Sequence, residues 1–171
     1  QYLLRVHWTG YRDEAAIQLE LEWLSAMREE CDLPVPEPIR TRDGALHVRV
    51  ASPDIPDPKC CSVLRWVRGR RLGERAVAKH YSAQGQLMAR MHNFSEAWST
   101  PGPARPREYD CSGLLRDIPA LCLPIDDIWS LLPAEYRGPF TSVAEQVRDA
   151  METLGVGASA FGLIHADLGV D

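Results

Sequence analysis

Hydrophobic and polar residues alternate along three stretches in the N-terminal part of the chain, residues 2–8, 45–50 and 61–67. A period of two, with many β-branched and aromatic residues, is typical of β-strands that bury one face. Asp43 and Gly44 precede the second stretch and form a turn signal. Because the connecting segments are short and rich in proline and glycine, we expect the three stretches to form one antiparallel sheet.

A helical pattern covers residues 13–31. Asp13 can cap this helix, and Glu14 suits its first turn because the helix dipole favours negative charge there. Proline-rich residues 33–39 cannot form a helix or a central strand, and residues 51–59 are expected to be a second loop. The apolar residues of the helix recur at steps of three and four, so we expect this face to pack on the sheet. They are Ile17, Leu21, Leu24, Met27 and Cys31.

The remainder of the chain is predicted to be mostly helical, with a boundary between two parts near Gly69. Ser142 and Glu145 have the spacing of a capping box, so the last helix is expected to begin there. Residues 160–164 form a short apolar run, predicted to be a strand that leads into His165. The helical patterns cover residues 74–97, 112–122, 126–136 and 142–154. In the first of them we expect an inward face of Val77, Tyr81, Leu87, Met88, Met91 and His92.

Composition narrows the class of protein. Of the 171 residues, 45% are hydrophobic and 25% are charged, which is typical of globular proteins. No run of about 18 apolar residues occurs, so we expect no membrane partner. The net charge of −5 argues against a broad nucleic-acid surface. The chain opens inside an expected strand and closes shortly after another strand-like run, so we expect it to be a piece of a longer protein.

The cysteines give no sign of a disulfide framework or a zinc site. Their number, five, is odd, and no two of them have the C-x-x-C spacing. Reduced thiols are typical of the cytoplasm, which is where we expect the protein to act.

One motif carries candidate chemistry. The apolar run 160–164 is followed by His165, Ala166 and Asp167. Phosphoryl transfer to a hydroxyl group needs a carboxylate that orients or accepts the hydroxyl proton, on a loop that its neighbours hold rigid. Asp167 suits that role, with His165 as its structural support. The same tripeptide also suits a capping aspartate beside a loop histidine, and on its own this alternative is the commoner one.

Six stretches, in the same order, are similar to the aminoglycoside phosphotransferase and choline kinase-like superfamily, the small-molecule relatives of protein kinases. They are YLLRVH, IQLELEWLSAM, LPVPEPIRTRDG, SVLRWVRGRRL, QGQLMARMHNF and GLIHADL. The resemblance implies a partial, two-lobed, protein-kinase-like α+β fold. Residues 1–69 would be the partial N-lobe, with an antiparallel sheet, one helix and the hinge. Residues 70–171 would be a mostly helical C-lobe that ends in the catalytic loop.

The resemblance also implies a role for individual residues. Arg5 would contact the α- and β-phosphates of ATP, although its place in the strand also suits a solvent-facing residue. Glu20 would pair with Arg5, with Glu22 as the second candidate. In the hinge, Arg65 would offer its carbonyl and Val67 its amide to adenine. His92, in contrast, is interpreted as a packed core histidine.

The resemblance lastly implies an ATP- and Mg²⁺-dependent kinase that phosphorylates a hydroxyl of a small molecule. The phosphate-covering loop would precede residue 1 and the magnesium ligands would follow Asp171, so the chain by itself is expected to be inactive. The alternative is a non-catalytic kinase-like module that binds a nucleotide or another ligand. Acidic residues in the region 108–127 suit a cationic acceptor, but they suit a solvated surface equally well.

Overall fold

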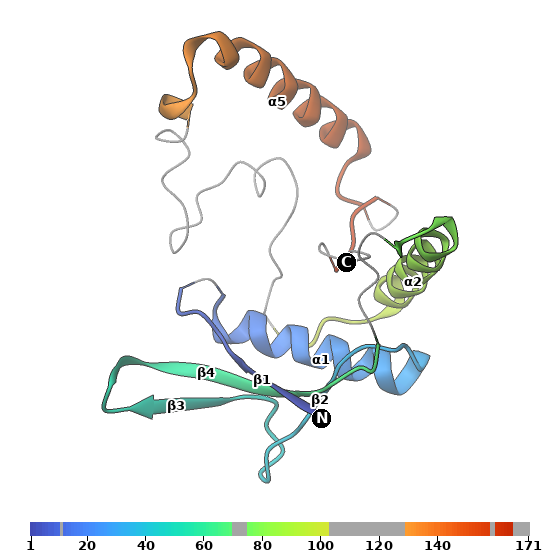
Figure 1. The fold of residues 1–171 in the computed structure, drawn as a ribbon. Helices are drawn as coiled ribbons and strands as arrows, with labels where there is room; N and C mark the ends of the chain where they lie inside the picture. The colour runs from blue at the N-terminus through green and yellow to red at the C-terminus, as the bar shows by residue number, and fades with distance from the viewer. Residues whose placement is uncertain (11, 70–74, 103–128, 158–159, 166–171) are drawn as a thin grey trace.

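The computed structural model describes residues 1–10, 12–69, 75–102, 129–157 and 160–165. An antiparallel sheet of four strands forms its N-terminal part (Figure 1). The strands are β1 (Tyr2–Val6), β2 (Glu37–Pro38), β3 (Val48–Ser52) and β4 (Ile55–Arg65). Since β1, β2 and β3 all pair with β4, the longest strand organises the sheet. The prediction of one antiparallel sheet is confirmed.

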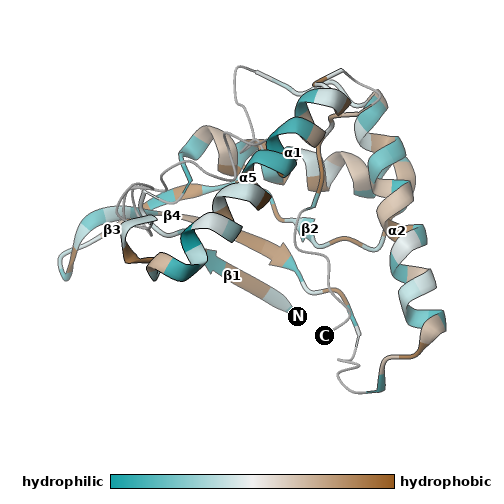
Figure 2. Ribbon diagram, turned by 90° about the horizontal axis from the view of Figure 1, so that it is seen from above, coloured by the Kyte–Doolittle hydropathy of each residue, from teal (hydrophilic) through white to brown (hydrophobic). Residues whose placement is uncertain are grey.

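The register of β1 on β4 decides which residues face the helix that follows. Leu3 lies opposite Leu64 and Arg5 lies opposite Ser62. Because side chains alternate along a strand, these pairs share one face of the sheet. Leu64 and Ser62 are buried on that face. Figure 2 shows the apolar residues along β1 and the adjoining end of β4.

The helix α1 (Glu14–Cys31) packs on this face of the sheet, as the sequence predicts. The side chain of Asp13 accepts a hydrogen bond from the amide of Ala16 at 2.7 Å and so caps the first turn. Asp32 ends the helix in the left-handed conformation, with φ of 46°. The core around α1 also includes Leu33, Val35, Leu46, Leu64, Met91 and Phe94.

The expected loop at 51–59 is wrong, because most of it belongs to a β-hairpin. β3 and β4 pair up to Ser52 and Ile55, with a register shift between Val50 and Ser52. Pro56 and Pro58 lie in the part of β4 that extends beyond its pairing with β1. Proline is tolerated in such a strand, because a backbone N–H is not needed on the unpaired side. Pro38 likewise lies in a strand that pairs on one side only.

The helix α2 (Ala78–Ala97) packs against α1 through Met91 and Phe94. The indole N–H of Trp23 donates a hydrogen bond to the Ser95 hydroxyl at 3.0 Å, and Arg90 donates one to the Cys31 carbonyl at 3.0 Å. The expected inward face is wrong in part, because only Met91 and, partly, Leu87 are covered. The exposed members are Val77, Tyr81, Met88 and His92, so His92 is not a core histidine.

The helix α5 (Ala134–Leu154) begins eight residues before the predicted start at Ser142. Ser142 lies inside it and accepts a hydrogen bond from Gln146, so the predicted capping box is absent. Pro139 lies inside the helix as well. The strand predicted at 160–164 is also wrong, because among the described residues no strand pairs with this segment. The helical pattern at 112–122 lies outside the described residues.

Within the part of the chain that the structure describes, no helix combines the length and hydropathy that crossing a membrane requires.

Candidate functional site

Three charged side chains meet where β1 approaches α1. The guanidinium of Arg5 contacts one carboxylate oxygen of Glu20 at 2.5 Å, and that of Arg12 contacts the other oxygen. The side chains of Arg5 and Glu20 are 33% and 22% exposed, so the pair is partly withdrawn from water. Two positive charges share one negative charge, which leaves the group of Arg5, Arg12 and Glu20, here called the arginine cluster, with a net charge of about +1.

The secondary structure explains why this cluster forms. Arg5 is on the helix-facing side of β1, since its cross-strand partner Ser62 is buried there. Glu20 lies on α1, and Arg12 directly precedes the N-cap Asp13. The predicted ion pair between Arg5 and Glu20 is therefore confirmed, and Arg5 is not a merely solvent-facing residue. Glu22, the second candidate, instead accepts a hydrogen bond from Gln18 at 2.8 Å.

A cavity of about 240 Å³ lies beside the arginine cluster. Arg5, His7, Trp8 and Arg12 are among its lining residues. The Nε2 atom of His7 lies 3.0 Å from the hydroxyl oxygen of Ser62. Burial lowers the pKa of His7, and the nearby charge of Arg5 lowers it further, so the ring is neutral at pH 7. The cavity thus offers two guanidinium groups to an anion, and guanidinium is well suited to phosphate oxygens.

Arg65 and Val67 mark the region where the resemblance implies an adenine site. Arg65 ends β4, where its backbone lies opposite both Tyr2 and Glu37 in the sheet register. The amide of Trp66 donates to the Gln1 carbonyl at 3.0 Å, and Val67 follows β4 with its side chain exposed. The contact of the Arg65 carbonyl and the Val67 amide with adenine stays a prediction.

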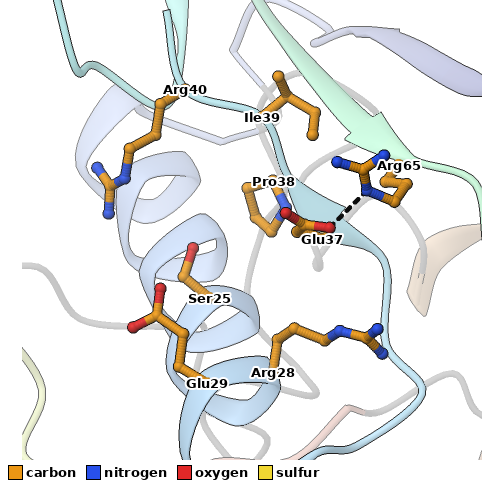
Figure 3. Close-up of a pocket in the computed structure, with 8 residues that line it drawn as sticks. All are labelled: Ser25, Arg28, Glu29, Glu37, Pro38, Ile39, Arg40 and Arg65. Carbon is orange, nitrogen blue, oxygen red and sulfur yellow. Dashed lines mark hydrogen bonds and ion pairs between the residues drawn. The ribbon is translucent and has the colours of Figure 1, made fainter.

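The Arg65 side chain is held in place at the rim of a second cavity, of about 350 Å³ (Figure 3). It donates a hydrogen bond to Glu37 at 2.6 Å and lies 5.5 Å from the centroid of the Tyr2 ring. The hydrogen bond and the charge of Glu37 raise the pKa of Arg65. The cavity separates this end of the sheet from α1 residues that include Ser25 and Arg28.

The expected catalytic residues fall at the edge of what the structure describes. His165 is exposed at the end of residues 160–165. Asp167 lies outside the described residues, as do the acidic residues of the region 108–127. Their roles, and the magnesium ligands expected after Asp171, stay predictions.

The part of Arg12 in the arginine cluster was not predicted from the sequence. A signal for it exists, because Arg12 directly precedes Asp13, the N-cap of the helix that carries Glu20. Glu20 follows eight residues later, a little over two helical turns or about 12 Å along the axis, which the arginine and glutamate side chains span together.

Comparisons with known proteins place these features in context. The family model described as the phosphotransferase enzyme family matches residues 1–171. An uncharacterised protein of Synechocystis sp. is 31% identical over 106 residues, which is 61% of this chain and 28% of that protein. Among solved structures, a microcompartment-associated aminopropanol kinase matches with a TM-score of 0.77 and 27% identity, over 99% of this chain and 51% of that kinase.

This chain thus spans about half of the aminopropanol kinase and under a third of the Synechocystis protein. The structural match confirms the expected kinase-like α+β fold, with an antiparallel sheet followed by helices.

Proposed function

Because the chain belongs to the phosphotransferase enzyme family, we propose that the full-length protein transfers a phosphoryl group from ATP to a hydroxyl of a small molecule. The observation that carries this proposal is the arginine cluster. An ion pair between a strand arginine and a helix glutamate fixes a cation beside a cavity. Such a fixed positive charge is what the phosphates of a nucleotide require.

The excess charge of the cluster supports phosphate binding more directly than the ion pair alone. Glu20 by itself would neutralise Arg5, and a neutral pair attracts a phosphate group weakly. Arg12 contacts the second oxygen of Glu20, so the three side chains carry a formal charge of +1 and two guanidinium groups line the cavity. In this proposal Glu20 orients both guanidinium groups toward the phosphates.

The remaining roles follow the resemblance. The Arg65 carbonyl and the Val67 amide hold adenine, at the junction of an N-lobe (1–69) and a C-lobe (70–171). Asp167 accepts or orients the proton of the acceptor hydroxyl, and His165 supports its loop. Mg²⁺, bound by residues after Asp171, would neutralise charge on the transferred phosphoryl group. We place the protein in the cytoplasm, where ATP is available and thiols stay reduced.

The test measures phosphoryl transfer by the full-length protein against a panel of small alcohols. An amino alcohol heads the panel, because an aminopropanol kinase shares this fold at 27% identity. Asp167→Asn is expected to lower kcat by about 10²–10⁴-fold, because the amide cannot accept the hydroxyl proton. The Kd for ATP is expected to change by much less than tenfold, since the cluster and the hinge are intact.

Asp171→Asn is the matched control, since it removes a carboxylate from the same segment without removing the proposed base. A near-normal kcat for Asp167→Asn would overturn the catalytic assignment. ATP binding without transfer to any alcohol would favour the alternative, a non-catalytic kinase-like binding module. Residues 1–171 alone are expected to show no turnover.

A further inference from the structure

A second group of side chains lies under the first turn of α1, apart from the arginine cluster. Glu14, His47 and Cys60 each offer one donor atom, and these three atoms lie within 4.8 Å of one another. They come from α1, from the segment before β3 and from β4. We propose that Glu14, His47 and Cys60 bind a zinc ion, with water as the fourth ligand.

The geometry is close to what zinc requires. Tetrahedral zinc with ordinary bond lengths to nitrogen, oxygen and sulfur sets its donor atoms about 3.4–3.6 Å apart. The Nε2 atom of His47 is already 3.6 Å from Oε1 of Glu14. The Sγ atom of Cys60 therefore has to move closer by about 1.2–1.4 Å at most, which a rotation of a short side chain achieves.

The hydrogen bonds around the site prepare His47 for this role. Its Nδ1 atom is 3.0 Å from the side-chain oxygen of Gln18. Because that oxygen can only accept, Nδ1 carries a proton, and in the neutral ring Nε2 then holds the lone pair that a metal ion needs. A partner on the second ring nitrogen is the usual support of a metal-bound histidine. Gln18 is one turn from Glu14 on α1, so a single helix supplies both a ligand and this support.

The charged groups around the site are also compatible with one bound metal ion. Glu14 uses its other oxygen, Oε2, to contact Arg49 at 3.5 Å, so it binds the metal through one oxygen only. Arg49 is the cross-strand partner of Cys60 and lies on the same side of the hairpin. Zinc binding displaces the proton of the Cys60 thiol to solvent and forms the zinc–thiolate bond. Thiolate, imidazole and carboxylate are each ordinary zinc ligands, and water completes the tetrahedron in zinc sites that have three protein ligands.

The experiment measures zinc affinity of the full-length protein by competition with a chromophoric chelator. The expected result is one zinc ion with micromolar or tighter affinity. Cys60→Ser and Glu14→Gln are each expected to weaken binding by more than tenfold. Gln18→Ala is expected to weaken it by about 10–100-fold, because it removes only the support of His47. Co²⁺ in place of zinc is expected to show a thiolate absorption band that Cys60→Ser abolishes.

Cys31→Ser is the matched control, because Cys31 ends the same helix about 25 Å from Glu14. It is expected to leave affinity and the cobalt band unchanged. Millimolar binding in the wild type would overturn the site, and so would an unchanged affinity in Cys60→Ser. Glu14→Gln is expected to fold normally, since Glu14 is an accessible side chain at a helix start, so a loss of affinity in this variant reports on the ligand. An unchanged zinc affinity in Glu14→Gln would also overturn the proposal. None of these outcomes depends on phosphoryl transfer.

Discussion

Glu20 has one negative charge and contacts the guanidinium groups of both Arg5 and Arg12. The three side chains together carry a formal charge of +1 at this partly buried position. Arg5 paired with Glu20 alone would form a neutral pair and attract a phosphate group weakly. With Arg12 beside the same carboxylate, Arg5 is expected to contribute more to phosphate binding. The number of arginines on Glu20 therefore matters as much as the ion pair itself.

Arg12→Gln is expected to weaken ATP binding by roughly 10–100-fold, since a hydrogen bond to a charged group contributes about 1.5–3 kcal/mol. The physical reason is that Glu20 then neutralises Arg5. Arg12→Lys, which keeps the charge, is expected to recover part of the loss. The measurement is the Kd for ATP, with Arg42→Gln as the control because Arg42 is exposed in the turn before β3. An unchanged Kd in Arg12→Gln would show that Arg12 does not act on the nucleotide.

His7 gives a prediction about pH. Burial and the neighbouring arginines lower its pKa in the folded protein from the ordinary 6.5. Between pH 6.5 and the lowered pKa, the unfolded chain binds a proton at His7 that the folded protein does not bind. The free energy of unfolding therefore decreases as the pH falls through this range. The slope from one group is at most about 1.4 kcal/mol per pH unit.

His7→Gln is expected to reduce the loss of stability on acidification, since an amide does not titrate. The measurement is the free energy of unfolding by urea at several pH values between about 5 and 7.5. His92→Gln is the control, because His92 is exposed on α2. Equal acid sensitivity in wild type and His7→Gln would contradict the assignment.

At the scale of elements, local sequence patterns correctly predicted the features that local interactions determine. The alternation in 2–8 and 61–67 identified paired strands, and the cap at Asp13 identified the start of α1. The outer part of the β3–β4 hairpin, within residues 51–59, was missed because Pro56 and Pro58 favour a loop. They are tolerated only where β4 extends past β1, and pairing partners are not visible in a local pattern.

The missed parts of the helices and of the site have the same cause. Ser142 and Glu145 have capping spacing, but the helix had already begun at Ala134, so the spacing was coincidental. His92 shares an apolar stripe, but α1 covers only the part of α2 that includes Met91 and Phe94. The group of Glu14, His47 and Cys60 was missed because it joins three distant segments, and no cysteine spacing reports it.

The C-cap of α1 gives a prediction at this scale. Asp32 has φ of 46°, and its negative charge lies at the negative end of the helix dipole. Asp32→Asn is expected to stabilise the protein by about 0.3–1 kcal/mol, because asparagine tolerates this conformation and removes the charge. Asp32→Val is expected to destabilise it by roughly 1–2 kcal/mol, because a β-branched residue is strained there.

Urea unfolding of the two Asp32 variants and the wild type gives the order of stabilities. Equal stability of the asparagine and valine variants would mean that this helix end is not held in the left-handed conformation in solution.

At the scale of the whole molecule, one core joins the sheet to α1 and α2. Leu64 of β4, Leu21 and Met27 of α1, and Met91 of α2 belong to the same buried cluster. The hydrogen bond from Trp23 to Ser95 adds a polar link between α1 and α2. The helix that carries Glu20 is therefore packed on both sides, and the position of the arginine cluster depends on α2 as well as on the sheet.

This shared core predicts that β4, α1 and α2 unfold together. Met91→Ala removes a side chain that is 2% exposed and is expected to cost about 2–5 kcal/mol. If the three elements form one cooperative unit, amide hydrogen exchange in β4 and in α1 will accelerate as much as in α2, since all three exchange through the same opening. Met88→Ala on the same helix is the control, because Met88 is 39% exposed and its loss is expected to cost less than about 0.5 kcal/mol. Faster exchange in α2 alone would show that the sheet folds independently of α2. Packing on the sheet would then be sufficient to hold α1 in position.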